Sequence, residues 1–230
     1  MKPIANIWNR EKRWRNSDSK VMNAEIPPTP HALVDEDVTG CRVFANRSDA
    51  IKSLPKGLKM AEVGVLFGDF SHEILGNLEP EILDCFDIFN SHEFPVIWGK
   101  PTSEIFQGLT HEQWFKKRFS SEIESQQVRV HVGDSSTLLS DLPDNFYDAI
   151  YLDGDHNYDG ILKDTKVAVR KVKRDGGYLI FNDYIMFDHI ANYKYGVVEV
   201  VNDLVRNQGW KLHWLALQNQ MFMDVCLVRK

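Results

Sequence analysis

Acidic residues recur after the short apolar runs of this chain, at positions where polar groups from different strands can meet. The residues concerned are Glu62, Asp87, Asp134, Asp153 with Asp155, and Asn182 with Asp183. Carboxylates accept hydrogen bonds from ribose hydroxyls, attract ammonium groups and ligate divalent cations. The recurrence predicts one ligand site built from several strand ends, and it carries more weight than any single motif.

The first of these acids precedes a glycine turn. Residues 60–71 combine a short apolar strand, Gly64 and Gly68, and a helix start that Ser71 can N-cap. Such glycines let the backbone approach a ligand, and the helix end presents free N–H groups. Glu62 stands where the dinucleotide motif G-x-G-x-x-G has its first glycine. An acid there suits a ligand with hydroxyls and an ammonium group, although an ordinary strand-to-helix turn fits equally well.

Two further acids have the spacing expected around a nucleoside. Asp87 follows Glu62 by 25 residues, and an acid at that position can accept both hydroxyls of a ribose. Asp134 lies in a Gly-Asp-Ser-Ser segment. It either receives an adenine amino group or caps the helix that starts near Ser136, and the sequence fits both.

The densest cluster reads Leu-Asp-Gly-Asp-His-Asn-Tyr after one strand and Phe-Asn-Asp-Tyr after another. Neighbouring strand ends are expected to bring together Asp153, Asp155, Asn182 and Asp183. With no cation in the local sequence, these oxygens favour a hard divalent ion such as Mg²⁺. A metal there would hold a substrate hydroxyl and lower its pKa. Asp155 is the first choice for the base that takes the proton, and His156 is the second.

A calcium loop is the competing interpretation of the D-x-D-x-N-x-D pattern that begins at Asp153. An EF-hand requires glycine at the sixth position and glutamate at the twelfth. Tyr158 and Asp164 stand there instead, and the preceding segment is a strand rather than a helix. We therefore reject the EF-hand.

Strands and helices alternate through most of the chain. Apolar runs predict strands at residues 58–63, 81–86, 128–132, 147–152, 178–181, 211–217 and 221–228. The last two are joined by three residues, which makes them an antiparallel hairpin. The order predicts an α/β fold, with a doubly wound, seven-stranded, mostly parallel sheet.

The domain plan has two parts. Residues 1–45 are polar and proline-containing, and we interpret them as an N-terminal arm or lid ahead of a core domain at 46–230. The arm either covers the site or packs across the interface of a homo-oligomer. No apolar run approaches the roughly 20 residues of a membrane span.

Composition limits the partners and the compartment. A net charge of −6 argues against binding nucleic acid through its backbone. The N-terminus has no apolar signal core, and three scattered cysteines form no disulfide frame or zinc motif. A cytoplasmic location is the expectation.

Residues 45 to 230 resemble the class I S-adenosylmethionine-dependent methyltransferases, with their Rossmann-like fold, in the glycine turn, Asp87, the strand order and the terminal hairpin. The Leu-Asp-Gly-Asp-His-Asn-Tyr and Gly-Gly-Tyr-Leu-Ile-Phe-Asn-Asp-Tyr segments resemble macrocin-type sugar O-methyltransferases more narrowly, and catechol-type O-methyltransferases more distantly. The resemblance implies that Glu62, Gly64 and Gly68 contact the methionine part of the cofactor, Asp87 the ribose and Asp134 the adenine region. Ser71 and Asp153 complete the expected cofactor-binding set.

The resemblance also implies a metal and a base. In metal-dependent relatives the matching positions hold Mg²⁺, which gives Asp153, Asn182 and Asp183 as ligands. The sugar enzymes usually have Asp-Asp where this chain has Asn-Asp, so one ligand charge is missing. The acid that matches Asp155 is the base in those enzymes.

The expected reaction is methyl transfer to the hydroxyl of a sugar or phenol. Two alternatives stay open: a methyltransferase that needs no metal or modifies nitrogen or carbon, and a non-methylating nucleotide-binding protein or NAD-dependent oxidoreductase. The chain lacks the Asn/Asp-Pro-Pro-Tyr/Phe motif of adenine and cytosine N-methyltransferases. Aromatic residues either wall an acceptor pocket or pack the arm against the core. They are Tyr184, Met186, Phe187, Tyr193 and Tyr195, with Trp98, Trp114 and Phe115 from the segment before residue 120.

Overall fold

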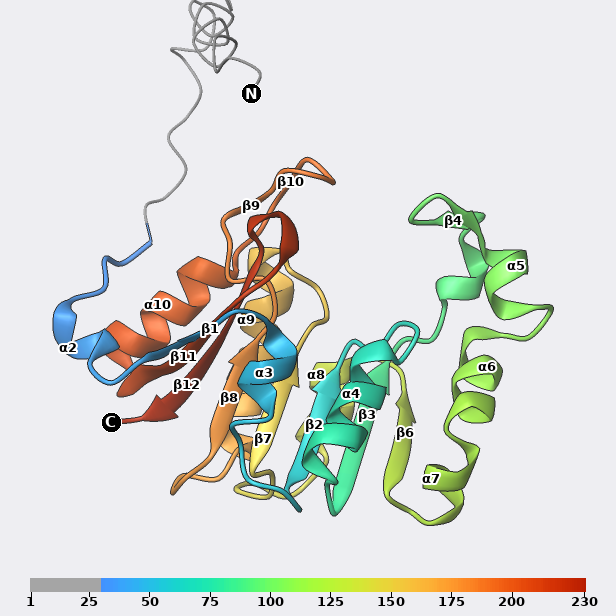
Figure 1. The fold of residues 1–230 in the computed structure, drawn as a ribbon, viewed down its shortest axis with the longest axis horizontal. Helices are drawn as coiled ribbons and strands as arrows, with labels where there is room; N and C mark the ends of the chain where they lie inside the picture. Colours follow the sequence, from blue (N-terminus) through green and yellow to red (C-terminus); the bar gives the residue numbers. More distant parts are fainter. Residues whose placement is uncertain (1–29) are drawn as a thin grey trace, which may run out of the picture.

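The computed structural model describes residues 30–230, and it is built around one eight-stranded sheet (Figure 1). The strand order is β1-β11-β12-β8-β7-β2-β3-β6. The strands are β1 (Arg42–Phe44), β2 (Lys59–Val63), β3 (Ile82–Asp87), β6 (Val128–Val132), β7 (Ala149–Leu152), β8 (Tyr178–Phe181), β11 (Trp210–Leu217) and β12 (Met223–Arg229). Of these, β12 runs antiparallel to both neighbours, and the other pairs are parallel. The predicted fold class and terminal hairpin are confirmed.

Helices cover both faces of the sheet, which explains why β7 is apolar and buried along its whole length. One face packs against α8, α9 and α10, and the other against α3, α4 and α6. The helices are α2 (Asp35–Val38), α3 (Arg47–Ile51), α4 (Asp69–Leu78), α5 (Thr102–Phe106), α6 (His111–Arg118), α7 (Ser120–Glu124), α8 (Ser135–Ser140), α9 (Tyr158–Lys171) and α10 (Val197–Asn207). Within residues 30–230, none of them has the length and apolar character to traverse a bilayer.

The eighth strand lies inside the segment that the sequence assigned to an arm. Strand β1 pairs in parallel with β11 at the sheet edge. Helix α2 is also attached to the domain, because the buried Asp37 pairs at 3.0 Å with Arg206 and with Lys230. Residues 30–45 are therefore part of the fold, whereas residues 1–29 lie outside the described chain. A three-residue strand with two exposed side chains has no apolar alternation to predict it.

Two small hairpins extend beyond the same edge of the sheet (Figure 1). The first, β4 (Val96–Ile97) with β5 (Lys100–Pro101), lies in the segment after β3. The second, β9 (Phe187–Asp188) with β10 (Tyr193–Lys194), follows β8. Because β3 and β8 end at this edge, it is the carboxyl edge of the parallel strands. The strand order reverses between β2 and β7, which is where ligands bind in open α/β sheets.

Candidate functional site

The glycine turn after β2 has a backbone that only glycine satisfies. Gly64 has a φ of +81°, and a Cβ there would lie 2.1 Å from the carbonyl oxygen of Asp153. Gly68 has a φ of +70°, and its Cβ would lie 2.5 Å from the Phe119 ring. The turn therefore packs directly against the end of β7. The close backbone approach predicted for these glycines is present between two strand ends.

Ser71 does not cap α4, which corrects the sequence prediction. The helix begins at Asp69 with Gly68 as its N-cap. Ser71 lies in the first turn, fully buried, and its hydroxyl donates to Oε2 of Glu62 at 2.5 Å. Burial raises the pKa of Glu62 to about 8, and Ser71 and Arg47 only partly oppose the rise. Near neutral pH the Glu62 carboxyl is protonated until a cation, such as a ligand ammonium group, arrives.

Asp87 holds the glycine turn from the neighbouring strand. Its carboxylate accepts hydrogen bonds from the backbone N–H groups of Val65 at 3.0 Å, Leu66 at 3.1 Å and Phe89 at 2.8 Å. Val65 and Leu66 both donate to Oδ2, so the one lone pair left for a ribose hydroxyl is on Oδ1. The structure gives Asp87 a role in shaping the turn, and ribose binding stays a prediction.

Asp134 caps α8, which was one of its two predicted roles. Its Oδ1 accepts from the backbone N–H of Thr137 at 2.9 Å, and its Oδ2 pairs with Nζ of Lys163 at 2.8 Å. The hydrogen bond from Lys163, followed by those from Ser136 and Thr137, lowers the pKa of Asp134. Its second predicted role, in binding adenine, is not tested by these contacts.

Three of the predicted metal ligands converge on one imidazole nitrogen. The Nε2 atom of His156 lies 3.1 Å from Oδ1 of Asn182, 3.7 Å from Oδ1 of Asp153 and 4.0 Å from Oδ2 of Asp183. Backbone hydrogen bonds fix the strand ends, from Asp153 to β2 and from Asn182 to β7. The expected meeting of neighbouring strand ends is therefore observed, with His156 at its centre.

Asp155, the first choice for the base, is turned away from this cluster. Its carboxylate accepts hydrogen bonds from the backbone and side chain of Asn157, the N-cap of α9. It also packs so closely on Gly160 that a Cβ there would lie 2.5 Å from the carboxyl carbon. An Asx turn at the start of α9 holds Asp155 at the surface, near enough to His156 to act on its charge, and the role of Asp155 as the base stays a prediction.

A buried polar network that the sequence did not indicate lies beneath the cluster. Asp224, fully buried on β12, accepts from the hydroxyl of Tyr151 at 2.8 Å and from Nδ2 of Asn182 at 3.1 Å. These contacts turn Oδ1 of Asn182 toward His156. The sequence did contain one signal for this network. Asp224 interrupts the apolar run of β12, and a buried acid needs hydrogen-bond partners.

Arg47 supplies the cation that the local sequence lacks. It reaches from the start of α3, with its guanidinium 4.5 Å above the Phe70 ring and Nη1 3.3 Å from the Tyr151 hydroxyl. Burial disfavours the charged form of Arg47. The nearby Tyr151, Asp224 and Asp153 stabilise that form and hold the pKa of Arg47 above its usual value. No spacing rule links it to Tyr151, which is 104 residues away.

The acids of the site hold protons more tightly than free carboxylic acids. Burial raises the pKa of Asp183 to about 7 and that of Asp224 to about 6, with Arg47 opposing both rises. Burial also raises the pKa of Asp153 well above its ordinary value. By contrast, burial lowers the pKa of His156, so its imidazole is neutral near pH 7. A cation bound at the site would stabilise the ionised carboxylates, so its binding would release these protons.

The donor set fits a hard divalent cation in its chemistry. Asp153, Asn182 and Asp183 offer two carboxylates and an amide oxygen around a common point, as Mg²⁺ requires. Among residues 30–230, no group of three His, Cys, Asp or Glu side chains is arranged as a metal cluster. The prediction of a metal therefore rests on the amide as the third protein ligand.

The aromatic residues divide between the core and the surface. Phe115 is fully buried in the core beside α4, so its predicted place in an acceptor pocket is wrong. Trp98 on the first hairpin is 79% exposed and meets Phe67 of the glycine turn edge-on at 5.6 Å. From the second hairpin, Tyr195 stacks on His156 at 4.6 Å. Aromatic rings thus flank both sides of the strand-end site.

The family model of a methyltransferase domain matches residues 61–184, which is more than half of the chain. The chain therefore belongs to this methyltransferase-domain family. The match begins in β2 and ends just after β8, so it contains the glycine turn and the acidic cluster. No curated protein sequence matches the chain.

Solved structures show the same fold at low sequence identity. An O-methyltransferase of tomaymycin synthesis from Streptomyces achromogenes, in complex with S-adenosylmethionine, has a TM-score of 0.56 at 14% identity, covering 80% of each chain. A precorrin-6y C5,15-methyltransferase from Geobacter metallireducens has 0.51 at 13%, covering 80% of this chain and 85% of its own. An rRNA methylase from Streptococcus thermophilus has 0.52 at 12%, covering 80% and 93%. Family and neighbours support an S-adenosylmethionine-dependent methyltransferase.

Proposed function

We propose that this protein transfers the methyl group of S-adenosylmethionine to the hydroxyl of a small molecule, a sugar or a phenol, with Mg²⁺ assistance. The observation that carries the proposal is the convergence of Asp153, Asn182, Asp183 and His156 beside the glycine turn. The narrower likeness to macrocin-type sugar O-methyltransferases, which rests on the two motif segments, is part of the proposal.

The glycine turn and its supporting acids bind the cofactor. The close packing of Gly64 on Asp153 shapes the turn that receives the methionine part, and Glu62 releases its proton to pair with the ammonium group. Asp87, already anchoring the turn through Oδ2, offers the remaining lone pair of Oδ1 to a ribose hydroxyl. Asp134 lies at the start of α8, where the resemblance puts the adenine. These contacts set the sulfonium methyl over the carboxyl edge.

The reaction is an in-line displacement that needs alignment and a deprotonated acceptor. The acceptor oxygen forms a bond to the methyl carbon as the carbon–sulfur bond breaks, leaving neutral S-adenosylhomocysteine. Asp153, Asn182 and Asp183 would hold Mg²⁺, which supplies a positive charge that lowers the hydroxyl pKa. His156 takes the proton in place of Asp155 in this proposal, because its imidazole faces the cluster and burial favours its neutral form. Nε2 accepts the proton only in the Nδ1–H tautomer, in which it no longer donates to Oδ1 of Asn182.

The two hairpins provide the acceptor site in this proposal. Phe187 and Tyr193 are about half exposed on the second hairpin, and Trp98 is exposed on the first. Rings of this kind stack on the apolar faces of sugars and phenols. The overall charge of −6 supports a small acceptor rather than nucleic acid.

A metal-independent methyltransferase is the second candidate, and Arg47 is the observation that favours it. Its guanidinium already gives the cluster one fixed positive charge near Asp153 and Asp224. His156 becomes a second cation when protonated. Without a metal, neutral His156 alone accepts the proton of the substrate. The imidazolium that results and Arg47 then neutralise the acids together.

Calorimetry and turnover separate these possibilities. The purified protein is titrated with S-adenosylhomocysteine, with and without Mg²⁺, and with NAD as a control. Radiolabelled S-adenosylmethionine is then offered with sugars and phenols in the presence of EDTA or Mg²⁺. Binding of S-adenosylhomocysteine but not NAD, with turnover lost in EDTA and restored by Mg²⁺, supports the proposal. Turnover that persists in EDTA supports the second candidate, and preferential binding of NAD contradicts both.

A further inference from the structure

A cleft lined by arginines opens at the amino edge of the parallel strands, opposite the methyl-transfer site. Its volume is about 500 Å³. Its lining residues are Asp144, Asn145, Val169, Arg170, Arg174 and Arg229. They come from the loop before β7, the end of α9, the turn before β8 and the end of β12. In a chain of net charge −6, three arginines at one cleft are a local reversal of charge.

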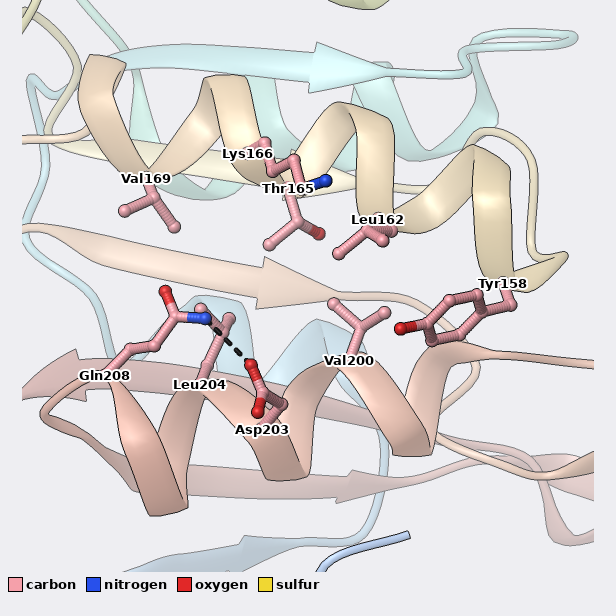
Figure 2. A pocket seen from close by; sticks show the side chains of 9 residues that line it. All are labelled: Tyr158, Leu162, Thr165, Lys166, Val169, Val200, Asp203, Leu204 and Gln208. Atoms are coloured by element: carbon pink, nitrogen blue, oxygen red, sulfur yellow. Dashed lines mark hydrogen bonds between the residues drawn. The ribbon is translucent and has the colours of Figure 1, made fainter. Parts of the chain in front are cut away.

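The cleft differs from the hollow between α9 and α10 (Figure 2). That hollow has a volume of about 160 Å³, and apolar side chains such as Leu162 and Val200 line most of it. Its two charged residues, Lys166 and Asp203, have opposite signs. It contains no convergence of like charges, so it suggests no ionic ligand.

Arg229 is held in place but has an unused donor. Its guanidinium carbon lies 4.3 Å above the ring of the buried Trp210, and Nη2 donates to the carbonyl of Val169 at 3.0 Å. Its Nε is buried and has no hydrogen-bond partner within residues 30–230. A buried N–H without a partner is rare in native proteins and calls for a ligand or water.

The other two arginines share one acid, Asp144, whose pKa they lower through space after the larger effect of Lys171. Arg170 and Arg174 are exposed, and neither forms a salt bridge or a side-chain hydrogen bond within the described residues. The acid of the cleft, Asp144, instead pairs with Nζ of the buried Lys171 at 2.7 Å. Burial and the nearby Arg174 lower the pKa of Arg229, so the free cleft is electrostatically unfavourable.

We propose that this cleft binds a small molecule that carries a phosphate group. Planar guanidinium groups bind phosphate through paired N–H donors, and three of them at one cleft match a doubly charged anion. The volume falls within the roughly 300–1,000 Å³ of small-molecule sites, which leaves room for more than the phosphate. Phosphate would pair with the exposed guanidinium groups of Arg170 and Arg174 and offset the repulsion between Arg174 and Arg229.

The test uses the full-length protein with inorganic phosphate and pyrophosphate as probes. Binding is measured by calorimetry and by thermal unfolding, with chloride at the same ionic strength as the reference. Arg170→Gln and Arg174→Gln remove exposed charges without removing a hydrogen bond. Lys166→Gln is the matched control, because it removes one exposed charge from the same helix outside the cleft. S-adenosylhomocysteine affinity in each variant reports whether the fold and the opposite edge are intact.

The proposal predicts that pyrophosphate raises the unfolding temperature of the wild type and of Lys166→Gln more than chloride does. Each arginine variant should bind it at least tenfold more weakly, with S-adenosylhomocysteine affinity unchanged. Equal binding by the wild type and both arginine variants would overturn it. Absence of any effect beyond chloride would overturn it as well. An RNA oligonucleotide that binds at these arginines and is not displaced by pyrophosphate would instead assign the surface to RNA.

Discussion

The two edges of the central sheet carry opposite charge and are built differently. At the carboxyl edge, Glu62, Asp153 and Asp183 gather around a cluster with Arg47 as its cation. At the amino edge, three arginines surround one acid that is already paired with lysine. Helix α9 runs between them, with its 14 residues spanning about 21 Å from the cluster to the arginine cleft.

The difference shows how burial decides what a charge cluster can do. The carboxyl-edge acids are largely buried, so their pKa values rise and their ionisation depends on a cation. Arg170 and Arg174 present exposed guanidinium groups to solvent. The carboxyl edge is thus sensitive to protons and cations, whereas the amino edge responds to anions and salt.

The largest effect is expected from Gly64→Ala at the carboxyl edge. The new Cβ would meet the Asp153 carbonyl at 2.1 Å, and a φ of +81° disfavours alanine. Two strand ends cannot separate without disturbing the cofactor turn. Affinity for S-adenosylhomocysteine, measured by calorimetry, should fall at least about 100-fold, or roughly 3 kcal/mol.

Gly76→Ala is the matched control for that variant. Gly76 lies within α4, its Cβ would meet nothing within 4 Å, and its backbone is helical. Alanine there should keep cofactor affinity and stabilise the protein by about 0.5–1 kcal/mol. Similar cofactor loss in both variants would mean that the helix, rather than the tight turn, limits binding.

Asp153→Asn is expected to separate binding from turnover. The substitution keeps the shape of the side chain but removes one charge from the proposed metal site. Turnover should fall about 100-fold or more, which corresponds to roughly 3 kcal/mol of transition-state stabilisation, with cofactor affinity nearly unchanged. Asp155→Asn is its counterpart, and turnover in that variant should stay within a few-fold of the wild type. A large loss in Asp155→Asn would restore Asp155 as the base and contradict the assignment to His156.

The contrast between the edges also explains what the sequence predicted. Strand-end acids were identifiable because apolar runs end at them, and parallel strands end at one edge. Arg47 and Asp224 were missed because their roles depend on contacts 104 and 42 residues away along the chain. Ser71 was misassigned because the helix starts three residues earlier than predicted, with the left-handed Gly68 as its N-cap. The arginine cleft was not predicted, because its residues come from four segments that are separate in the sequence.

Folding stability should fall as pH rises through the neutral range. The pKa of Glu62 is about 8 in the folded protein, and those of Asp183 and Asp224 are about 7 and 6, all above their unfolded values. The folded state therefore binds more protons than the unfolded state between about pH 4 and 8. The stabilisation is complete below the unfolded pKa values and is lost progressively up to about pH 8. Urea unfolding without ligand should show a loss on the order of 3 kcal/mol between pH 5 and 8.

Ligands of the carboxyl edge should flatten that pH dependence. Mg²⁺ would pair with the ionised carboxylates at high pH, and a smaller loss of stability is expected in its presence. Pyrophosphate acts at the opposite edge and gains negative charge between pH 5 and 8, so its stabilisation of the protein should not weaken as the pH rises. If Mg²⁺ leaves the pH dependence of unfolding stability unchanged, the metal assignment is contradicted. The proposal for the arginine cleft does not depend on that result.

The smallest expected effect is a shift in the pH profile of turnover in Arg47→Gln. Removing this cation makes ionisation of Asp153, Asp183 and Asp224 harder, so their pKa values rise further. The acidic limb of the turnover profile should therefore move upward by about half a pH unit to one unit. Arg47→Lys keeps the charge but loses the fork that reaches Tyr151, and it should restore most of the limb. Equal shifts in both variants would show that Arg47 acts through its hydrogen bond to Tyr151, and that the carboxyl edge relies on geometry rather than on an internal cation.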